Sequence, residues 1–128
     1  MFSGQWMQKF LNEWNNEPEV ANELANIDFN SSIAYGFDGE DSPRGFIVIE
    51  KGKAVTASDY DGEDVNWDLR ASKEDWQKWF GKPPGMMALG MAYTSRSLKF
   101  NKGDYSAMIK DPRMAGPFIK SFAVMGRV

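Results

Sequence analysis

The chain has 128 residues, which suit one domain with a single hydrophobic core and are too few for two ordinary cores. Its 42% hydrophobic content excludes a disordered or fibrous chain, and its formal net charge is only −3. Because cysteine and histidine are both absent, disulfides, thiolate or imidazole metal sites, and histidine-based catalysis are excluded. We therefore expect one domain over residues 1–128 that is not an enzyme, needs no cofactor or metal, and lies in the cytoplasm.

The small net charge conceals two halves of opposite sign. Residues 1–75 carry 16 acidic and 6 basic side chains, whereas residues 76–128 carry 2 acidic and 9 basic ones. Either the halves complement each other across the folded surface, or the basic half meets an anionic membrane surface. The basic residues are spread out and the whole chain is acidic, so we expect no nucleic-acid partner.

Two short helices are predicted at the N-terminus. Ser3 is a suitable N-cap for the first, and Pro18 suits the first turn of a second that runs through Leu24. The apolar face of the first helix consists of Trp6, Phe10, Leu11 and Trp14.

The period of the hydrophobic pattern then changes from helical to two, which is typical of half-buried strands. Turn-forming residues divide this region into strands at 27–37, 46–50, 54–60 and 65–70. Because the turns between them are short, we expect these four strands to form an antiparallel meander.

Helical spacing returns after residue 71. Ser72 begins a capped helix that ends at Gly81, and residues 86–93 form a helix that is apolar nearly all round and therefore expected to be buried. Leu98 and Phe100 mark a short fifth strand. The tail is predicted as apolar helices that break at Asp111-Pro112 and restart after Pro117. The order of elements indicates an α+β fold with the helices on one face of the sheet.

The acidic turn at residues 59–64 is the most tempting polar motif, with four carboxylates in six residues. It lacks the spacing of an EF-hand loop, in which glycine is sixth and a bidentate Glu is twelfth. A solvated turn, a weak cation site and a catalytic carboxylate pair remain the three interpretations, and the first is preferred. Glycine-rich phosphate-binding and serine-hydrolase motifs are absent.

Methionine is concentrated in the second half, where six of the eight lie after residue 85. Flexible thioether side chains fill irregular apolar spaces and adapt to ligands of varied shape. For any one methionine a plain core position is the simpler explanation. As a set beside tryptophan and phenylalanine, they favour an adaptable apolar pocket.

The second half also resembles the type-two sterol carrier protein domain. The resemblance rests on Trp67-Asp-Leu-Arg-Ala-Ser-Lys-Glu-Asp-Trp-Gln-Lys-Trp-Phe-Gly81, on the apolar segment 86–93, and on Ser97-Leu-Lys-Phe-Asn-Lys-Gly103 before a Met-bearing helix. It covers residues 65–125, and the first half matches in the order of elements only. The resemblance implies a twisted five-stranded, mostly antiparallel sheet with helices on one face and an apolar tunnel between them.

The resemblance further implies a noncatalytic protein that binds and transfers a sterol, fatty acid, acyl-coenzyme A or phospholipid. The residues it implies as lining the tunnel are Trp76, Trp79, Phe80, Met87, Met91, Phe100, Phe118 and Phe122. Transient contact with an anionic membrane surface fits the basic half. The alternative is a scaffold or homodimerisation module that presents the same apolar helices to a protein partner. An enzyme relying on carboxylates and tyrosines alone is the third interpretation.

Overall fold

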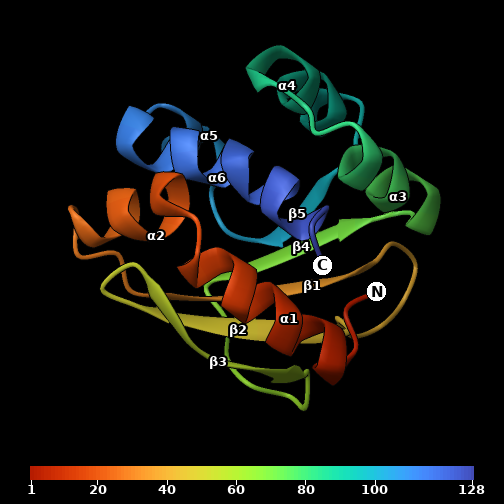
Figure 1. The fold of residues 1–128 in the computed structure, drawn as a ribbon. Helices are drawn as coiled ribbons and strands as arrows, with labels where there is room; N and C mark the ends of the chain where they lie inside the picture. Colours follow the sequence, from red (N-terminus) through yellow and green to blue (C-terminus); the bar gives the residue numbers. More distant parts are fainter.

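The computed structural model describes all 128 residues, as six helices and five strands (Figure 1). In chain order they are α1 (Gly4–Asn15), α2 (Pro18–Ala25), β1 (Ser31–Phe37), β2 (Gly45–Glu50), β3 (Lys53–Asp59), β4 (Trp67–Ala71), α3 (Lys73–Gly81), α4 (Met86–Thr94), β5 (Lys99–Lys102), α5 (Tyr105–Ile109) and α6 (Pro112–Met125).

The strands form one sheet in the order β3-β2-β1-β4-β5. Three of the four pairings are antiparallel, but β1 and β4 are parallel. The predicted four-strand meander is therefore wrong after its third strand. Residues 60–66 carry the chain from β3, at one edge of the sheet, past β2 and β1 to the start of β4. There the Asn66 N–H donates to the Ser32 carbonyl of β1 at 2.9 Å. Period-two alternation fixes which face a side chain takes and carries no information about which strand it pairs with.

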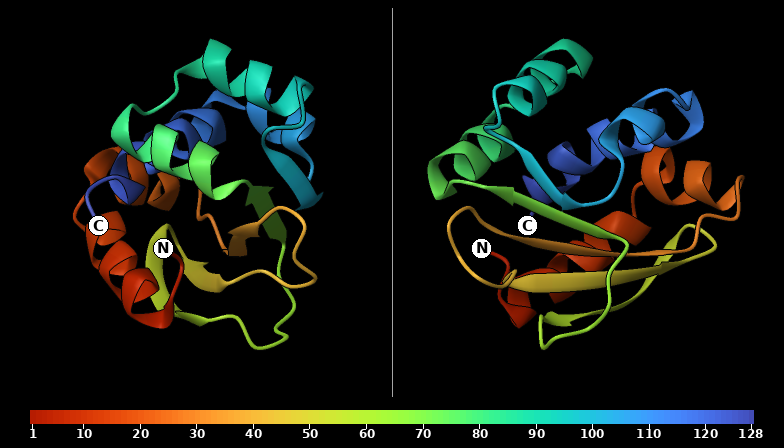
Figure 2. Two further views of the ribbon diagram at one scale, coloured as in Figure 1. Left: turned by 90° about the vertical axis from the view of Figure 1, so that its right-hand side faces the viewer. Right: turned by 180° about the vertical axis from the view of Figure 1, so that it is seen from behind.

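The helices gather on one face of the curved sheet, as predicted (Figures 1 and 2). Their apolar sides bury the inward residues of the three central strands, which are Ile33, Tyr35, Ile47, Ile49 and Leu69. Trp76 of α3 lies fully buried in this core, and its indole N–H donates to the Gly36 carbonyl at 2.9 Å. The Trp76 ring contacts Phe2 from the N-terminus and Phe122 from α6, so the core joins both ends of the chain.

On the opposite face of the sheet, a polar cluster surrounds Arg70 of β4. Arg70 is only 3% exposed, although its alternation with Leu69 predicts an outward polar side chain. Its guanidinium forms two hydrogen bonds with Asp68, at 2.7 and 3.1 Å, and donates to the Glu40 carbonyl at 2.7 Å. The loop between β1 and β2 thus covers Arg70 and receives its remaining donors.

Local signals placed most of the helix and strand ends correctly. Ser3 and Ser72 are N-caps whose hydroxyls accept backbone N–H groups, as predicted. The strand predicted over 27–37 begins only at Ser31, because Asp28 takes a left-handed conformation with φ of 49°. The tail also differs, since α6 runs without interruption from residue 112 through Pro117.

The apolar helix α4 departs most from expectation. Only Leu89 is buried, whereas Met86, Met87 and Met91 are 52%, 81% and 67% exposed. Its N-cap, Gly85, provides no side-chain hydrogen bond. All views show α4 as the element farthest from the sheet, so it has a neighbour on one side only (Figures 1 and 2). A helix that is apolar all round therefore leaves most of its surface uncovered here.

Candidate functional site

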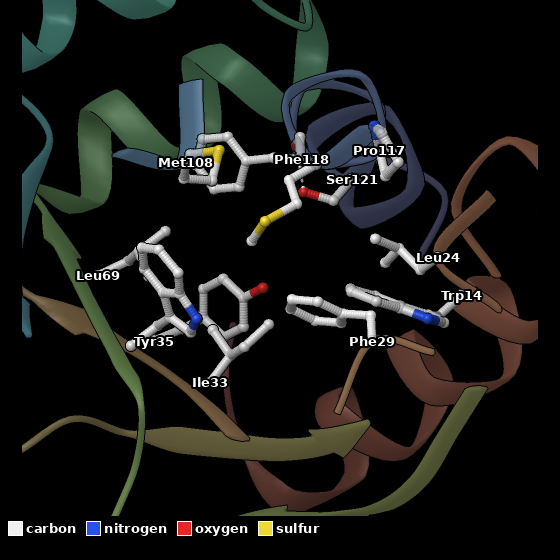
Figure 3. Close-up of a pocket in the computed structure, with 12 residues that line it drawn as sticks. Trp14, Leu24, Phe29, Ile33, Tyr35, Leu69, Met108, Pro117, Phe118 and Ser121 are labelled. Atoms are coloured by element: carbon white, nitrogen blue, oxygen red, sulfur yellow. Dashed lines mark hydrogen bonds between the residues drawn. The ribbon is translucent and has the colours of Figure 1, made fainter. Parts of the chain in front are cut away.

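An apolar cavity lies between the sheet and the α2, α5 and α6 helices (Figure 3). Its volume is about 40 Å³. Strands β1 and β4 supply its floor, the end of α1, α2 and the start of the following loop supply one side, and α5 and α6 supply the roof. The wall consists of Trp14, Leu24, Phe29, Ile33, Tyr35, Trp67, Leu69, Met108, Met114, Pro117, Phe118 and Ser121.

The cavity is too small for a lipid in the conformation described. For comparison, an engineered apolar cavity of about 150 Å³ binds a molecule the size of benzene. The present 40 Å³ is well below that. A larger apolar ligand therefore requires the wall to move, and the two methionines in the roof are the most adaptable side chains there.

A groove adjoins the cavity and opens to solvent between the start of β1 and α5. Its volume is about 430 Å³. Its rim is polar and includes Asn30, Asn66, Asp104 and Asp111. Phe29, Trp67, Met108 and Met114 line both the groove and the cavity. Displacement of these four shared side chains would join the two spaces, so the groove is the natural route to the interior.

No charged side chain lines the cavity. The indole N–H of Trp14 donates to the Gly52 carbonyl at 3.0 Å, and the Ser121 hydroxyl donates to the Phe118 carbonyl at 2.5 Å. The hydroxyl of Tyr35 points into the cavity (Figure 3). Complete burial raises the pKa of Tyr35 well above its ordinary value of 10.0, so its phenol is neutral at physiological pH.

The eight residues predicted to line a tunnel lie in three different surroundings. Only Phe118 lines the cavity. Trp76, Trp79 and Phe122 are buried in the core, while Phe80 and Phe100 are half-buried against it. Met87 and Met91 project from α4 into solvent, which corrects the expectation that this helix would face the interior.

The sequence did not predict most of the residues of the cavity wall, because all eight predicted lining residues lie in the methionine-rich second half. Residues from the first half form much of the wall, including Trp14, Leu24, Ile33 and Tyr35. The available signal was alternation: Ile33 and Tyr35 point to the same face as their register partners Trp67 and Leu69. That signal becomes useful only when β1 is known to pair with β4.

The acidic and basic halves of the chain complement each other. Three ion pairs join them: Lys99 with Asp38 at 3.0 Å, Lys120 with Glu19 at 3.1 Å, and Arg127 with Glu17 at 2.8 Å. The Lys120–Glu19 pair joins α6 to α2, and the Arg127–Glu17 pair joins the residue that precedes α2 to the segment that follows α6.

The acidic segment at the end of β3 is held by one hydrogen bond to the N-terminal helix and one within the turn. Asp59 accepts from the Gly4 N–H at 2.8 Å, and the Glu63 carboxylate accepts from the Asp61 N–H at 2.6 Å. Nowhere do three Asp or Glu side chains gather in a way that would hold a metal ion. These contacts are compatible with the preferred interpretation of the segment as a solvated turn.

None of the six helices combines the length and the apolar character required to cross a bilayer. The most apolar of them, α4, has nine residues.

No family model and no curated protein sequence matches the chain. Solved structures do match its fold. Sterol carrier protein 2 aligns over 100% of this chain and 98% of its own, with a TM-score of 0.78 and 16% identity. A conserved hypothetical protein from Thermus thermophilus, described as possibly a sterol carrier protein, aligns over 99% and 85%, with a TM-score of 0.62 and 18% identity. A ubiquinone synthesis protein, UbiJ-SCP2, aligns over 95% and 88%, with a TM-score of 0.61 and 10% identity. The predicted resemblance is confirmed at the level of fold: the chain has the same fold as sterol carrier protein 2.

Proposed function

We propose that this protein binds an apolar lipid between its sheet and the α5–α6 roof, and that it does so without catalysing a reaction. The observation that carries the proposal is the uncharged, almost wholly apolar cavity that adjoins an open groove. The sterol carrier protein 2-like fold supports the same class of ligand. Burial of the ligand would provide the driving force, at about 25 cal/mol per Å² of apolar surface before the losses of association.

Aromatic contacts connect the cavity wall to several of the predicted tunnel residues, which supports their inclusion in a widened site. The ring of Phe118, in the wall, lies 5.5 Å from Phe122 and 6.0 Å from Phe100. Phe122 in turn lies 5.8 Å from Trp79 and 6.1 Å from Trp76. In our proposal, a ligand that displaces Phe118 meets these rings next, so they form the inner wall of the widened site.

Native mass spectrometry of freshly purified protein tests the proposal. We expect an additional mass from a bound apolar molecule, and displacement of a fluorescent fatty acid or sterol analogue by unlabelled lipid. Trp79→Ala, which shortens the extended wall, should weaken this binding while the protein remains folded by circular dichroism. Failure to find or load any apolar ligand in the folded wild-type protein would refute the proposal.

The exposed methionines of α4 support delivery of the ligand at a membrane. Met87 and Met91 present uncovered apolar surface, and Lys82 and Arg96 flank the helix without forming ion pairs. An apolar surface with basic neighbours suits the interface of an anionic bilayer, where each nearby cation contributes about 1 kcal/mol.

Met87→Asp separates membrane contact from the alternative of a homodimer. Because Met87 is 81% exposed, the substitution should change the free energy of unfolding by less than about 0.5 kcal/mol. It should nevertheless reduce co-sedimentation with phosphatidylserine vesicles. Unchanged vesicle binding would contradict the membrane role. A dimer in sedimentation velocity that Met87→Asp converts to monomer would instead favour a second copy of the chain on this surface.

A further inference from the structure

Tyr35 is placed in the middle of the sheet with its polar end toward the cavity. It belongs to β1, the central strand, and is 2% exposed. Its ring is fixed by stacking on Phe2 at 5.7 Å and by edge contacts with Phe10 at 5.8 Å and Trp76 at 6.1 Å. Because the ring is held from several sides, its hydroxyl has a defined position in the cavity (Figure 3).

This hydroxyl has no hydrogen-bond partner within the protein, and neither does the indole N–H of Trp67 in the same wall. Ser121 donates to the Phe118 carbonyl, and the indole of Trp14 donates to the Gly52 carbonyl. No fully enclosed side-chain nitrogen or oxygen of the protein lacks a partner, so the Tyr35 hydroxyl is open to the cavity space, where a water molecule or a ligand oxygen can reach it. The other polar groups of the wall are the Ser121 hydroxyl and the indole N–H groups of Trp14 and Trp67, and an indole can only donate. The partner of this donor therefore has to come from outside the protein.

The surroundings also define the charge of that partner. No Lys or Arg lines the cavity, so a carboxylate or phosphate beside Tyr35 would be buried without a counterion. A neutral oxygen avoids that loss and accepts the phenolic proton. We propose that Tyr35 is the polar anchor of the lipid site and donates a hydrogen bond to a neutral ketone, ester or hydroxyl oxygen at the buried end of the ligand.

This assignment rests on the proposed function and narrows it to a class of ligand. Uncharged lipids with one oxygen at the end that enters the cavity should be preferred to alkanes, which leave the hydroxyl unpaired. They should also be preferred to ionised fatty acids oriented with the carboxylate inward. The ligand's hydrocarbon then extends past the shared residues Met108 and Met114 toward the groove.

Tyr35→Phe tests the assignment because it removes one oxygen and leaves the ring. The probes are a long-chain methyl ketone and the alkane with the same number of carbons, each measured by displacement of a fluorescent apolar probe. Tyr35→Phe should weaken ketone binding about 3- to 10-fold, the effect of one hydrogen bond, and leave alkane binding within about twofold of wild type. The matched control is Tyr105→Phe, because Tyr105 is 7% exposed but stacks on Tyr93 outside the cavity wall.

The infrared carbonyl stretch of a ¹³C-labelled ketone provides a readout that a purely structural role would not move. When the ketone is bound to wild type or to Tyr105→Phe, its carbonyl stretching frequency should be lower than in alkane solvent. When it is bound to Tyr35→Phe, the frequency should equal the value in alkane solvent. If Tyr35→Phe fails to fold, an unshifted carbonyl stretch in wild type alone overturns the inference. Equal binding of the ketone by wild type and by folded Tyr35→Phe also overturns it, while the proposed function stands. Failure of both ketone and alkane to bind wild type overturns the proposed function itself.

Discussion

Leu69→Ala should make the protein less stable and at the same time a better host for a bulky apolar ligand. Leu69 is 1% exposed, lies in the floor of the cavity, and pairs in register with Tyr35 on β1 and with Phe100 on β5. Because its strand is held on both sides, the backbone cannot move inward to fill the space that the side chain leaves. The removed volume therefore adds to the existing 40 Å³.

The expected loss of stability has two parts. Three carbon atoms leave the core, at about 0.8 kcal/mol each, which gives about 2.4 kcal/mol. An unrelaxed void of about 50 Å³ adds about 1.2 kcal/mol at ~24 cal/mol per Å³. The free energy of unfolding in urea should therefore fall by about 4 kcal/mol, within the range seen for buried Leu→Ala substitutions.

The ligand assay then distinguishes the cavity from the rest of the core. Affinity for a sterol, measured by fluorescence displacement, should rise in Leu69→Ala because less rearrangement of the wall is needed. Leu98→Ala is the matched control, since Leu98 is fully buried but does not line the cavity. It should lose similar stability and keep the wild-type affinity. Equal sterol affinity in all three proteins, or a fall in Leu69→Ala alone, would refute the idea that cavity space limits binding.

Two further predictions concern the charged groups. Arg70→Ala should lower the free energy of unfolding by about 3 kcal/mol, because it leaves Asp68 without its partner. A loss below about 1 kcal/mol in urea titration would contradict this. As the control, Arg44→Ala removes an exposed ion pair and should change the free energy of unfolding by less than about 1 kcal/mol. The hydrogen bond from the Glu19 backbone N–H, and to a smaller extent Arg127, lowers the pKa of Glu17 below its ordinary 4.5. The ionised Glu17 therefore stabilises the fold fully above pH 4.5, and this stabilisation is lost as the pH falls through the lowered pKa of the folded state. Glu17→Gln should therefore reduce the free energy of unfolding by about 1 kcal/mol at pH 7. Thermal melts between pH 7 and 3 should show that the stability of the variant falls less steeply in acid than that of the wild type. Parallel pH profiles for the two proteins would contradict this prediction.

Local structure was predictable from the sequence because its causes are local. Ser3 and Ser72 cap helices through hydrogen bonds to residues three positions away, and proline at the first helical position marks the start of α2. The fold class followed from the order of these elements. The parallel pairing of β1 with β4 did not, because it joins residues about 34 positions apart and depends on a crossover that alternation cannot reveal.

The candidate site was predicted in kind and less well in detail. The sequence indicates an apolar pocket, but α4 illustrates why composition does not identify its wall. Met87 is as apolar as Met108, yet the first lies 81% exposed and the second is 4% exposed. The difference arises from where the two helices lie relative to the sheet, which is a property of the tertiary arrangement. Arg70 is the opposite case. It is a charged residue, yet it is buried because the loop between β1 and β2 encloses it.

The ring cluster around Trp76 also determines when folding of these residues can finish. Phe2 and Phe122 are both fully buried and both contact Trp76, although 120 positions separate them. During synthesis, the N-terminal aromatic residues must therefore wait until α6 has left the ribosome before their core is complete. Contacts of such long range slow folding, and they leave exposed apolar surface in the meantime. Until α6 is available, the aromatic side chains of the first half therefore present apolar surface that favours aggregation.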